Sequence, residues 1–135
     1  MDASEIFAEL KVNYNDDYLS LPAPRAGKLT DADIQRWSES LGRPRAAVYE
    51  LIALHLARGF HNFALTFRYC DDIVNDLHSV ISSLDECRPP LFWEVFLAFD
   101  EGEYYHGNNR QEDPEATYTR PLIARIVEGS ADGDG

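Results

Sequence analysis

The chain has 135 residues, about the size of one domain, and 44% of them are apolar, which is enough for a core and excludes a wholly disordered protein. The 24 acidic and 12 basic residues give a net charge of -12, which argues against general nucleic-acid binding because that depends on neutralising phosphates. The acidic N-terminus lacks the basic region of a signal peptide, and no apolar run approaches the roughly 20 residues that span a bilayer. We therefore expect a cytoplasmic protein that does not enter a membrane.

Two short helices are predicted in the first third of the chain. Residues 3–13 place apolar side chains at helical spacing, and the prolines within residues 21–27 indicate a loop. Thr30 is suited to cap the next helix, because its hydroxyl can accept a hydrogen bond from the first turn. Gly42 is suited to end that helix in a left-handed conformation.

A longer helical region follows. Pro44 suits the first turn of a third helix, and Gly59 indicates a break or bend, although a single helix running through it stays open. Residues 60–84 carry the strongest helical pattern. The apolar residues at three- and four-residue steps are Phe60, Phe63, Phe67, Cys70, Val74, Leu77 and Ile81. A second apolar strip on the opposite side predicts a central helix buried by neighbours on both sides.

The last third of the chain is less regular. A turn at residues 85–89 leads to a helix over 90–106, which would form an antiparallel hairpin with the central helix. Residues 108–120 look like a polar loop, residues 121–127 are ambiguous between helix and strand, and residues 129–135 look like a disordered tail. We predict an all-α, compact bundle of about five helices, with a single domain over 1–128.

Several polar residues fall on the apolar faces of the two central helices. At about 100° per residue, Asp71 and His78 lie on the apolar stripe of the first helix, with Asn75 at its edge. On the second helix, Glu103 and His106 continue the apolar line. The antiparallel hairpin would bring Asp71 close to Glu103, with His106 beside them. Buried carboxylates must be paired, protonated or bound to metal, so a polar cluster is predicted here.

Three interpretations of this polar cluster stay open. It could be a structural network, since Arg68 lies one turn before Asp71 and could pair with it or with Glu103. It could be a functional pocket, because paired carboxylates suit acid–base chemistry. It could also hold a divalent metal between Asp71, Glu103 and His106, as in a small metal-dependent hydrolase. No named catalytic or metal motif is present, so we predict no catalytic residue, cofactor or bound metal, and the sequence favours a non-enzyme.

The segment 31–56 holds two predicted helices joined at a glycine. The small, turn and apolar positions of a helix-turn-helix motif are occupied by Ser38, Gly42, Val48 and Leu51. The segment resembles that DNA-binding family over about 25 residues, and it lies where six basic residues outnumber four acidic ones, between 25 and 58. The residues that the resemblance assigns to DNA contact are Arg43, Arg45 and Tyr49. The rest of the chain, at about -14, would repel DNA, so this is the alternative hypothesis.

Acidic residues concentrate on and after the two central helices. Those that could meet a partner are Asp72, Asp76, Asp100, Glu101, Glu112 and Asp113. A solvated face would explain them, but such a surface also suits a basic protein partner, whose association it would accelerate. Our leading hypothesis is a non-catalytic acidic binding protein that docks a basic protein. Immunity-type or antitoxin-type inhibition is its most concrete form, by analogy of charge alone.

Overall fold

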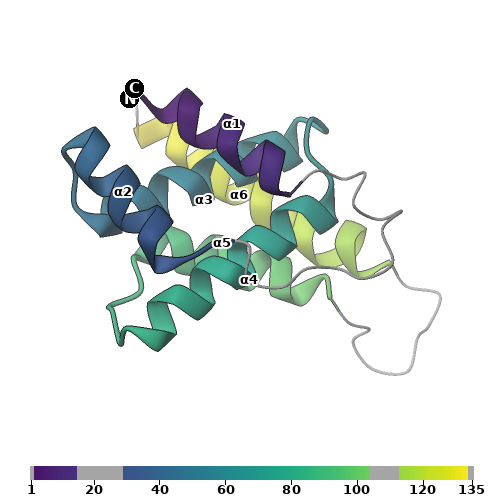
Figure 1. Cartoon of the computed structure of the whole chain (residues 1–135). Helices are drawn as coiled ribbons and strands as arrows, with labels where there is room; N and C mark the ends of the chain where they lie inside the picture. The colour runs from purple at the N-terminus through teal and green to yellow at the C-terminus, as the bar shows by residue number, and fades with distance from the viewer. Residues whose placement is uncertain (1, 15–28, 104–112, 134–135) are drawn as a thin grey trace.

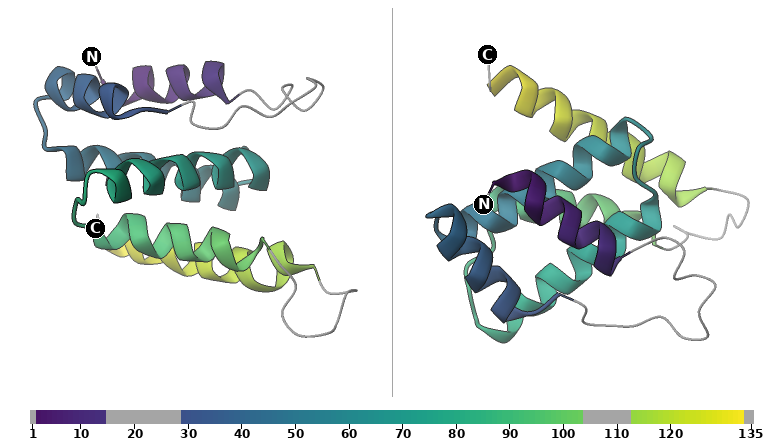
Figure 2. Two further views of the ribbon diagram at one scale, coloured as in Figure 1. Left: turned by 60° about the horizontal axis from the view of Figure 1, so that its bottom comes forward. Right: turned by 45° about the horizontal axis from the view of Figure 1, so that its top comes forward.

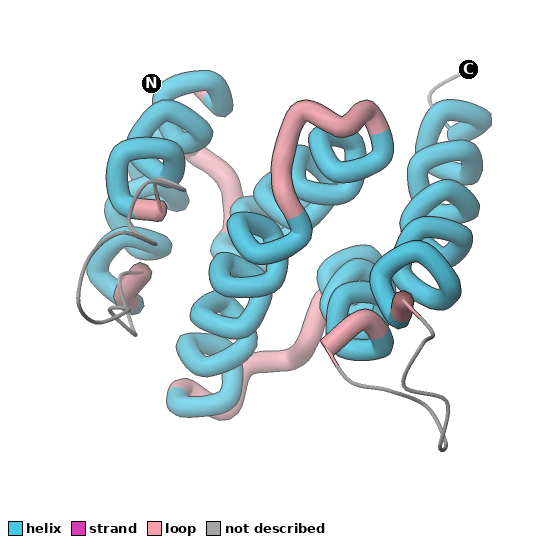
Figure 3. The backbone as a smooth tube through the Cα atoms, turned by 90° about the vertical axis from the view of Figure 1, so that its right-hand side faces the viewer, coloured by secondary structure: helices cyan, strands magenta, loops and turns pink. Residues whose placement is uncertain are grey.

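The computed structural model describes residues 2–14, 29–103 and 113–133. Within these ranges the chain is helical and contains no strand (Figures 1 and 3). The helices are α1 (Ala3–Asn13), α2 (Asp31–Leu41), α3 (Arg45–His61), α4 (Phe67–Ser83), α5 (Pro90–Glu101) and α6 (Arg120–Gly133), with a π-helical turn, η2 (Glu115–Thr119), before α6. The predicted all-α bundle is confirmed.

The helices form three layers, made by α1 with α2, α3 with α4, and α5 with α6 (Figure 2). Helix α3 lies in the middle layer and contacts α1, α2, α4, α5 and α6. The core between the layers is built from large apolar side chains. Those that are almost completely buried include Ile6, Ile34, Trp37, Tyr49, Ile52, Leu56, Phe60, Leu77, Phe92 and Phe99. None of the described helices is long and apolar enough to cross a membrane.

Local signals at the ends of α2 act as predicted. Thr30 Oγ1 accepts a hydrogen bond from the backbone N–H of Asp33, and the Asp33 carboxylate accepts one from the backbone N–H of Thr30. Gly42 ends the helix with a φ of 66°, a conformation that disfavours residues with a Cβ. Pro44 is the residue immediately before α3, where its fixed φ is compatible with entry into the helix.

The predicted helix over 60–84 begins later than expected, at Phe67. Helix α3 runs through Gly59 and ends at His61, and the chain then turns back over residues 62–66. Phe63, predicted on the apolar stripe, is 77% exposed, and its φ is 62°. Gly59 allows Leu65 to pack back closely onto the helix, because a Cβ at residue 59 would lie 2.3 Å from Cδ1 of Leu65 unless that side chain moved. The glycine therefore permits the returning loop rather than breaking the helix.

Helices α4 and α5 form the predicted antiparallel hairpin. His78 stacks on Phe96, and Asp71 meets Glu103, so the pairing runs in opposite directions along the two helices. The second helix is shorter than expected, since α5 ends at Glu101 and residues 104–106 lie outside the described part. Neither Cys70, which is buried, nor Cys87, which is exposed, is in a disulfide.

The C-terminal region is more helical than the sequence indicated. Residues 114–120, predicted as loop, are helical and include η2 and the first residue of α6, and the ambiguous segment 121–127 is also part of α6. Helix α6 continues to Gly133, into the segment for which we expected a disordered tail. Thr119 explains the anchoring of this region, because its buried hydroxyl donates a 2.7 Å hydrogen bond to the carbonyl oxygen of Ala98 in α5.

Candidate functional site

An acidic edge, defined here as Asp71, Asp72, Asp100 and Glu103, is formed where the start of α4 faces the end of α5. The carboxyl groups of Asp71 and Glu103 are hydrogen-bonded, as the hairpin predicted. Burial, the hydrogen bond to Glu103 and the negative charges nearby raise the pKa of Asp71 to about 8. Asp71 Oδ1 is buried and has no hydrogen-bond partner among the described residues. At neutral pH one proton is therefore held within this edge.

The other members of the predicted polar cluster are arranged differently. The side-chain amide of Asn75 donates a 2.8 Å hydrogen bond to the backbone carbonyl of Asp71, so it supports the helix rather than the carboxyl group. Arg68 is exposed, and His106 lies outside the described residues. His78 lies further along α4, stacked on Phe96 with ring centroids 4.5 Å apart. Burial, followed by the charge of Arg88, lowers the pKa of His78.

The described residues contain no group of three or more His, Cys, Asp or Glu side chains that could hold a metal ion. The contact between Asp71 and Glu103 supplies two carboxyl groups, and the third member of the hypothesised set, His106, is not described. The hydrolase hypothesis stays a prediction, without a ligand set in this part of the chain.

The six acidic residues predicted to dock a partner have different surroundings. Asp72 and Asp100 belong to the acidic edge, and their charges act on Asp71. Asp76 accepts a short hydrogen bond from the hydroxyl of Tyr14, which joins the end of α1 to α4. Asp113 accepts a 3.1 Å hydrogen bond from the backbone N–H of Glu115 and so caps the turn that leads to α6. Glu101 is half-buried, and Glu112 lies outside the described residues.

The residues assigned to DNA contact are mostly engaged within the fold. Arg45 binds both carboxylate oxygens of Glu86, at 3.0 and 3.1 Å, and also contacts Asp31 at 2.8 Å. Tyr49 is 1% exposed, and its hydroxyl donates a 2.6 Å hydrogen bond to Glu86. The hydrogen bonds from Arg45 hold the pKa of Glu86 below its usual value. Arg45 and Tyr49 therefore join α3 to the turn after α4, which gives the helix-turn-helix hypothesis no support from these two side chains.

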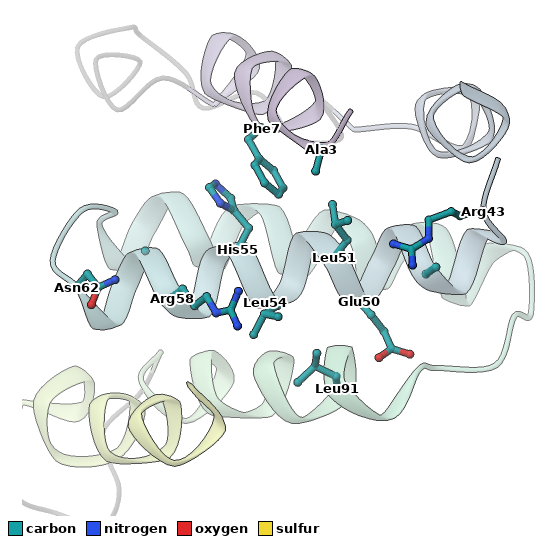
Figure 4. Close-up of a pocket in the computed structure, with 12 residues that line it drawn as sticks. Ala3, Phe7, Arg43, Glu50, Leu51, Leu54, His55, Arg58, Asn62 and Leu91 are labelled. Atoms are coloured by element: carbon teal, nitrogen blue, oxygen red, sulfur yellow. The ribbon is translucent and has the colours of Figure 1, made fainter. Parts of the chain in front are cut away.

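A groove that the sequence reasoning missed runs along α3 between α1 and α5, with a volume of about 740 Å³ (Figure 4). Its lining residues are Ala3, Phe7, Arg43, Ala47, Glu50, Leu51, Leu54, His55, Arg58, Gly59, Asn62 and Leu91. Phe7 of α1 stacks on His55 of α3 with ring centroids 3.7 Å apart. Burial, followed by the charge of Lys11, lowers the pKa of His55. The sequence could have indicated this groove, because apolar residues occur on every side of α3 and one side is left partly uncovered.

A smaller groove, of about 360 Å³, lies between α5 and α6. Its lining residues are Glu94, Leu97, Ala98, Glu101, Leu122, Arg125 and Ile126.

Comparison of the chain with models of known protein families, with characterised proteins and with solved structures finds no match. The possible roles of the acidic edge and of the α3 groove therefore depend on their own geometry and charge.

Proposed function

We propose that the protein is a non-catalytic binding protein that docks a basic protein partner through the acidic edge. The observation that carries this proposal is the hydrogen bond between the carboxyl groups of Asp71 and Glu103, beside the further carboxylates of Asp72 and Asp100. The net charge of -12 supports it, because a long-range negative potential steers cationic partners toward the protein.

Four carboxylates away from the acidic edge are paired with arginines of the same chain. Arg36 pairs with Glu9 and Asp33, and Arg45 pairs with Glu86 and Asp31. At the acidic edge, the carboxylates of Glu103, Asp72 and Asp100 together raise the pKa of Asp71. Holding several negatively charged carboxylates close together is unfavourable, and a bound proton reduces the repulsion between them.

A cationic side chain from a partner would replace that proton. An arginine is the best suited, because its planar fork can bind two carboxylate oxygens at once. Its charge would lower the pKa of Asp71, so the complex would release a proton at neutral pH. Basic toxins and nucleases are partners of this chemistry, and an immunity-type or antitoxin-type inhibitor is the most concrete form of the proposed function.

The proposal can be tested with an octa-arginine peptide by isothermal titration calorimetry at pH 7. Asp100→Asn/Glu103→Gln neutralises two carboxylates of the acidic edge. The matched control, Glu39→Gln/Glu128→Gln, makes the same change in net charge at exposed positions on α2 and α6. We expect the first variant to bind about tenfold more weakly than the control.

The same titration, repeated in phosphate and in Tris, measures proton release through the different ionisation enthalpies of the two buffers. We expect release of up to about one proton per complex in the wild type and a clear reduction in the Asp100→Asn/Glu103→Gln variant. Equal affinities for the two variants, or binding without proton release, would show that only net charge matters and would overturn the proposal.

A further inference from the structure

Helices α5 and α6 form an outer layer of the bundle, and an apolar groove of about 360 Å³, the α5–α6 groove, lies between them (Figure 2). Among its lining residues, Ala98 is almost completely buried, but Leu97 remains 40% exposed. Leu122 and Ile126 reach the groove from α6 and are half-buried. An apolar surface that extends over two neighbouring helices is typical of a site where another protein docks.

The two sides of the α5–α6 groove carry opposite charges. Glu94 lies on α5, Arg125 lies on α6, and both residues are exposed. Neither side chain forms a hydrogen bond or an ion pair with another residue of the described ranges. The exposed Arg36, by contrast, pairs with Glu9 and Asp33. The charges of Glu94 and Arg125 are therefore available to a second molecule.

Glu94 and Arg125 lie at nearly the same level along the groove. Helices α5 and α6 run in opposite directions from the point where Thr119 donates its hydrogen bond to Ala98 (Figure 2). Glu94 lies about 6 Å before Ala98 along α5, and Arg125 lies about 9 Å after Thr119 in the same direction. The two opposite charges are therefore within about one helical turn of each other along the groove.

We propose that two copies of this chain associate through the α5–α6 groove, with a two-fold axis that runs along the groove. This axis places α5 of each copy on α6 of the other, so that Glu94 of each copy faces Arg125 of the other and the ion pair forms twice. A two-fold axis across the helices would instead place α5 on α5 and bring Glu94 toward Glu101, which has the same charge.

The charges of the groove favour a second copy over other occupants. A partner that carries only positive charge would be repelled by Arg125, and one that carries only negative charge would be repelled by Glu94. A second copy presents both charges in the positions that match. The dimer uses residues other than those of the acidic edge, so this proposal does not rest on the proposed function.

Sedimentation velocity at protein concentrations from about 5 µM to about 1 mM tests for the dimer. We expect a reversible dimer with a Kd on the order of 100 µM at about 0.15 M salt, because the groove is small for a protein interface. The net charge of -12 on each copy opposes association, and salt screens this long-range repulsion. Association should therefore strengthen between about 0.02 M and about 0.15 M salt, whereas docking of a basic protein would weaken.

Charge reversal tests the proposed ion pair. Glu94→Arg and the control Glu39→Arg, at an exposed position on α2, make the same change in net charge. Lower net charge by itself would strengthen association of both variants, but we expect Glu94→Arg to weaken the dimer about tenfold. Glu94→Arg/Arg125→Glu keeps the net charge of the wild type and forms the pair with its signs exchanged, so it should restore the affinity to within about threefold.

The apolar part of the interface has a matched pair of variants. Leu97→Ser removes the exposed leucine of the groove, and Leu84→Ser removes a leucine of similar exposure, 45%, at the end of α4. We expect Leu97→Ser to weaken the dimer about tenfold, because its side chain is buried in both copies, and Leu84→Ser to leave it unchanged. Thermal unfolding confirms that each variant folds.

The dependence of NMR chemical shifts on protein concentration locates the interface. We expect shifts around Leu97 on α5 and Arg125 on α6, and none around Phe7 on α1. A monomer at every concentration, equal effects of Glu94→Arg and Glu39→Arg, no recovery in the double variant, or shifts confined to other surfaces would each overturn the proposal. If an octa-arginine peptide shifts the signals around Leu97 of a protein that stays monomeric, the groove takes a basic partner and the proposal is also overturned.

Discussion

The carboxyl group of Asp71, in the second turn of α4, is hydrogen-bonded to the carboxyl group of Glu103, just after α5. Two acids can share a hydrogen bond only while one of them keeps its proton, and burial together with this contact raises the pKa of Asp71. The contact between α4 and α5 at this point therefore depends on pH, because it is lost when both carboxyl groups are ionised.

The first prediction concerns the pH dependence of stability. The pKa of Asp71 is about 8 in the folded protein against an ordinary value of 3.8, so between these pH values the folded state keeps a proton that the unfolded state has released. The contribution of Asp71 to stability should fall as pH rises from about 4 to about 8 and stay constant above that. Asp71→Asn should raise the free energy of unfolding at pH 9 by on the order of 2 kcal/mol, a value reduced from the full shift because the group is partly solvated.

Urea unfolding of the wild type and of Asp71→Asn at pH 5 and pH 9 measures this difference. Asp85→Asn, at an exposed position after α4, is the control and should show no comparable gain. If Asp71→Asn raises the free energy of unfolding equally at pH 5 and pH 9, the proton shared by Asp71 and Glu103 does not cause the change in stability.

The second prediction concerns Arg45, whose guanidinium joins α3 to Glu86. Arg45→Ala leaves the half-buried carboxylate of Glu86 without its main cation, so the free energy of unfolding should fall by about 1.5–3 kcal/mol. Arg43→Ala, two residues earlier and exposed, should change it by less than about 0.5 kcal/mol.

Chemical denaturation at neutral and acidic pH tests whether the ion pair between Arg45 and Glu86 causes this loss of stability. The pKa of Glu86 is lowered from its ordinary value of 4.5, so its contribution to stability is present above pH 4.5 and is lost as the pH falls through the lowered pKa of the folded protein. The difference between Arg45→Ala and the wild type should therefore shrink at about pH 3. A difference that is equal at both pH values would mean that lost packing, and not the ion pair, is responsible.

The third prediction concerns Gly59, which lies within a helix and in contact with Leu65. Alanine at an exposed helical position normally adds about 1 kcal/mol over glycine. Gly59→Ala should instead destabilise the protein by about 1–2 kcal/mol, because its Cβ would lie 2.3 Å from Leu65 Cδ1. Gly129→Ala, where nothing lies within 4 Å of the added Cβ, should be neutral or stabilising.

Thermal unfolding of both glycine variants is the measurement. The double variant Gly59→Ala/Leu65→Ala separates the clash from other effects, since removing the Leu65 side chain should abolish most of the cost of Gly59→Ala. Additive effects of the two substitutions would contradict the proposed close contact.

The fourth prediction concerns the hydrogen bond from Tyr14 to Asp76, which fastens α1 to α4. Tyr14 is 2% exposed, so Tyr14→Phe leaves Asp76 without this donor in a partly buried setting. We expect a loss of about 1–2 kcal/mol in the free energy of unfolding. A double-mutant cycle with Asp76→Ala should show coupling between the two residues, and hydrogen exchange should show faster opening of α1. Uncoupled effects would mean that the hydroxyl is not what holds α1.

The sequence by itself determined the features that depend on near neighbours in the chain. Thr30 and Gly42 mark the ends of α2 because a cap needs only the adjacent turn of helix. The inward position of Asp71 followed from helical periodicity, and its contact with Glu103 followed from a short turn that makes the two helices antiparallel. The acidic edge was thus predictable in outline, including two of its members, Asp72 and Asp100, as candidate docking residues.

Only the tertiary structure decided the features that join distant parts of the chain. The start of α4 at Phe67 depends on Leu65 packing against Gly59, and helical periodicity cannot show that contact because Phe60, Phe63 and Phe67 fit one continuous stripe. Glu86 accepts a hydrogen bond from Arg45, which lies 41 residues earlier in the chain. This contact engages within the fold an arginine that the local sequence had suggested for DNA contact. The α3 groove likewise exists because α1 and α5 leave one side of α3 uncovered, and which side of an apolar helix stays open is set by how its neighbours pack and not by its own sequence.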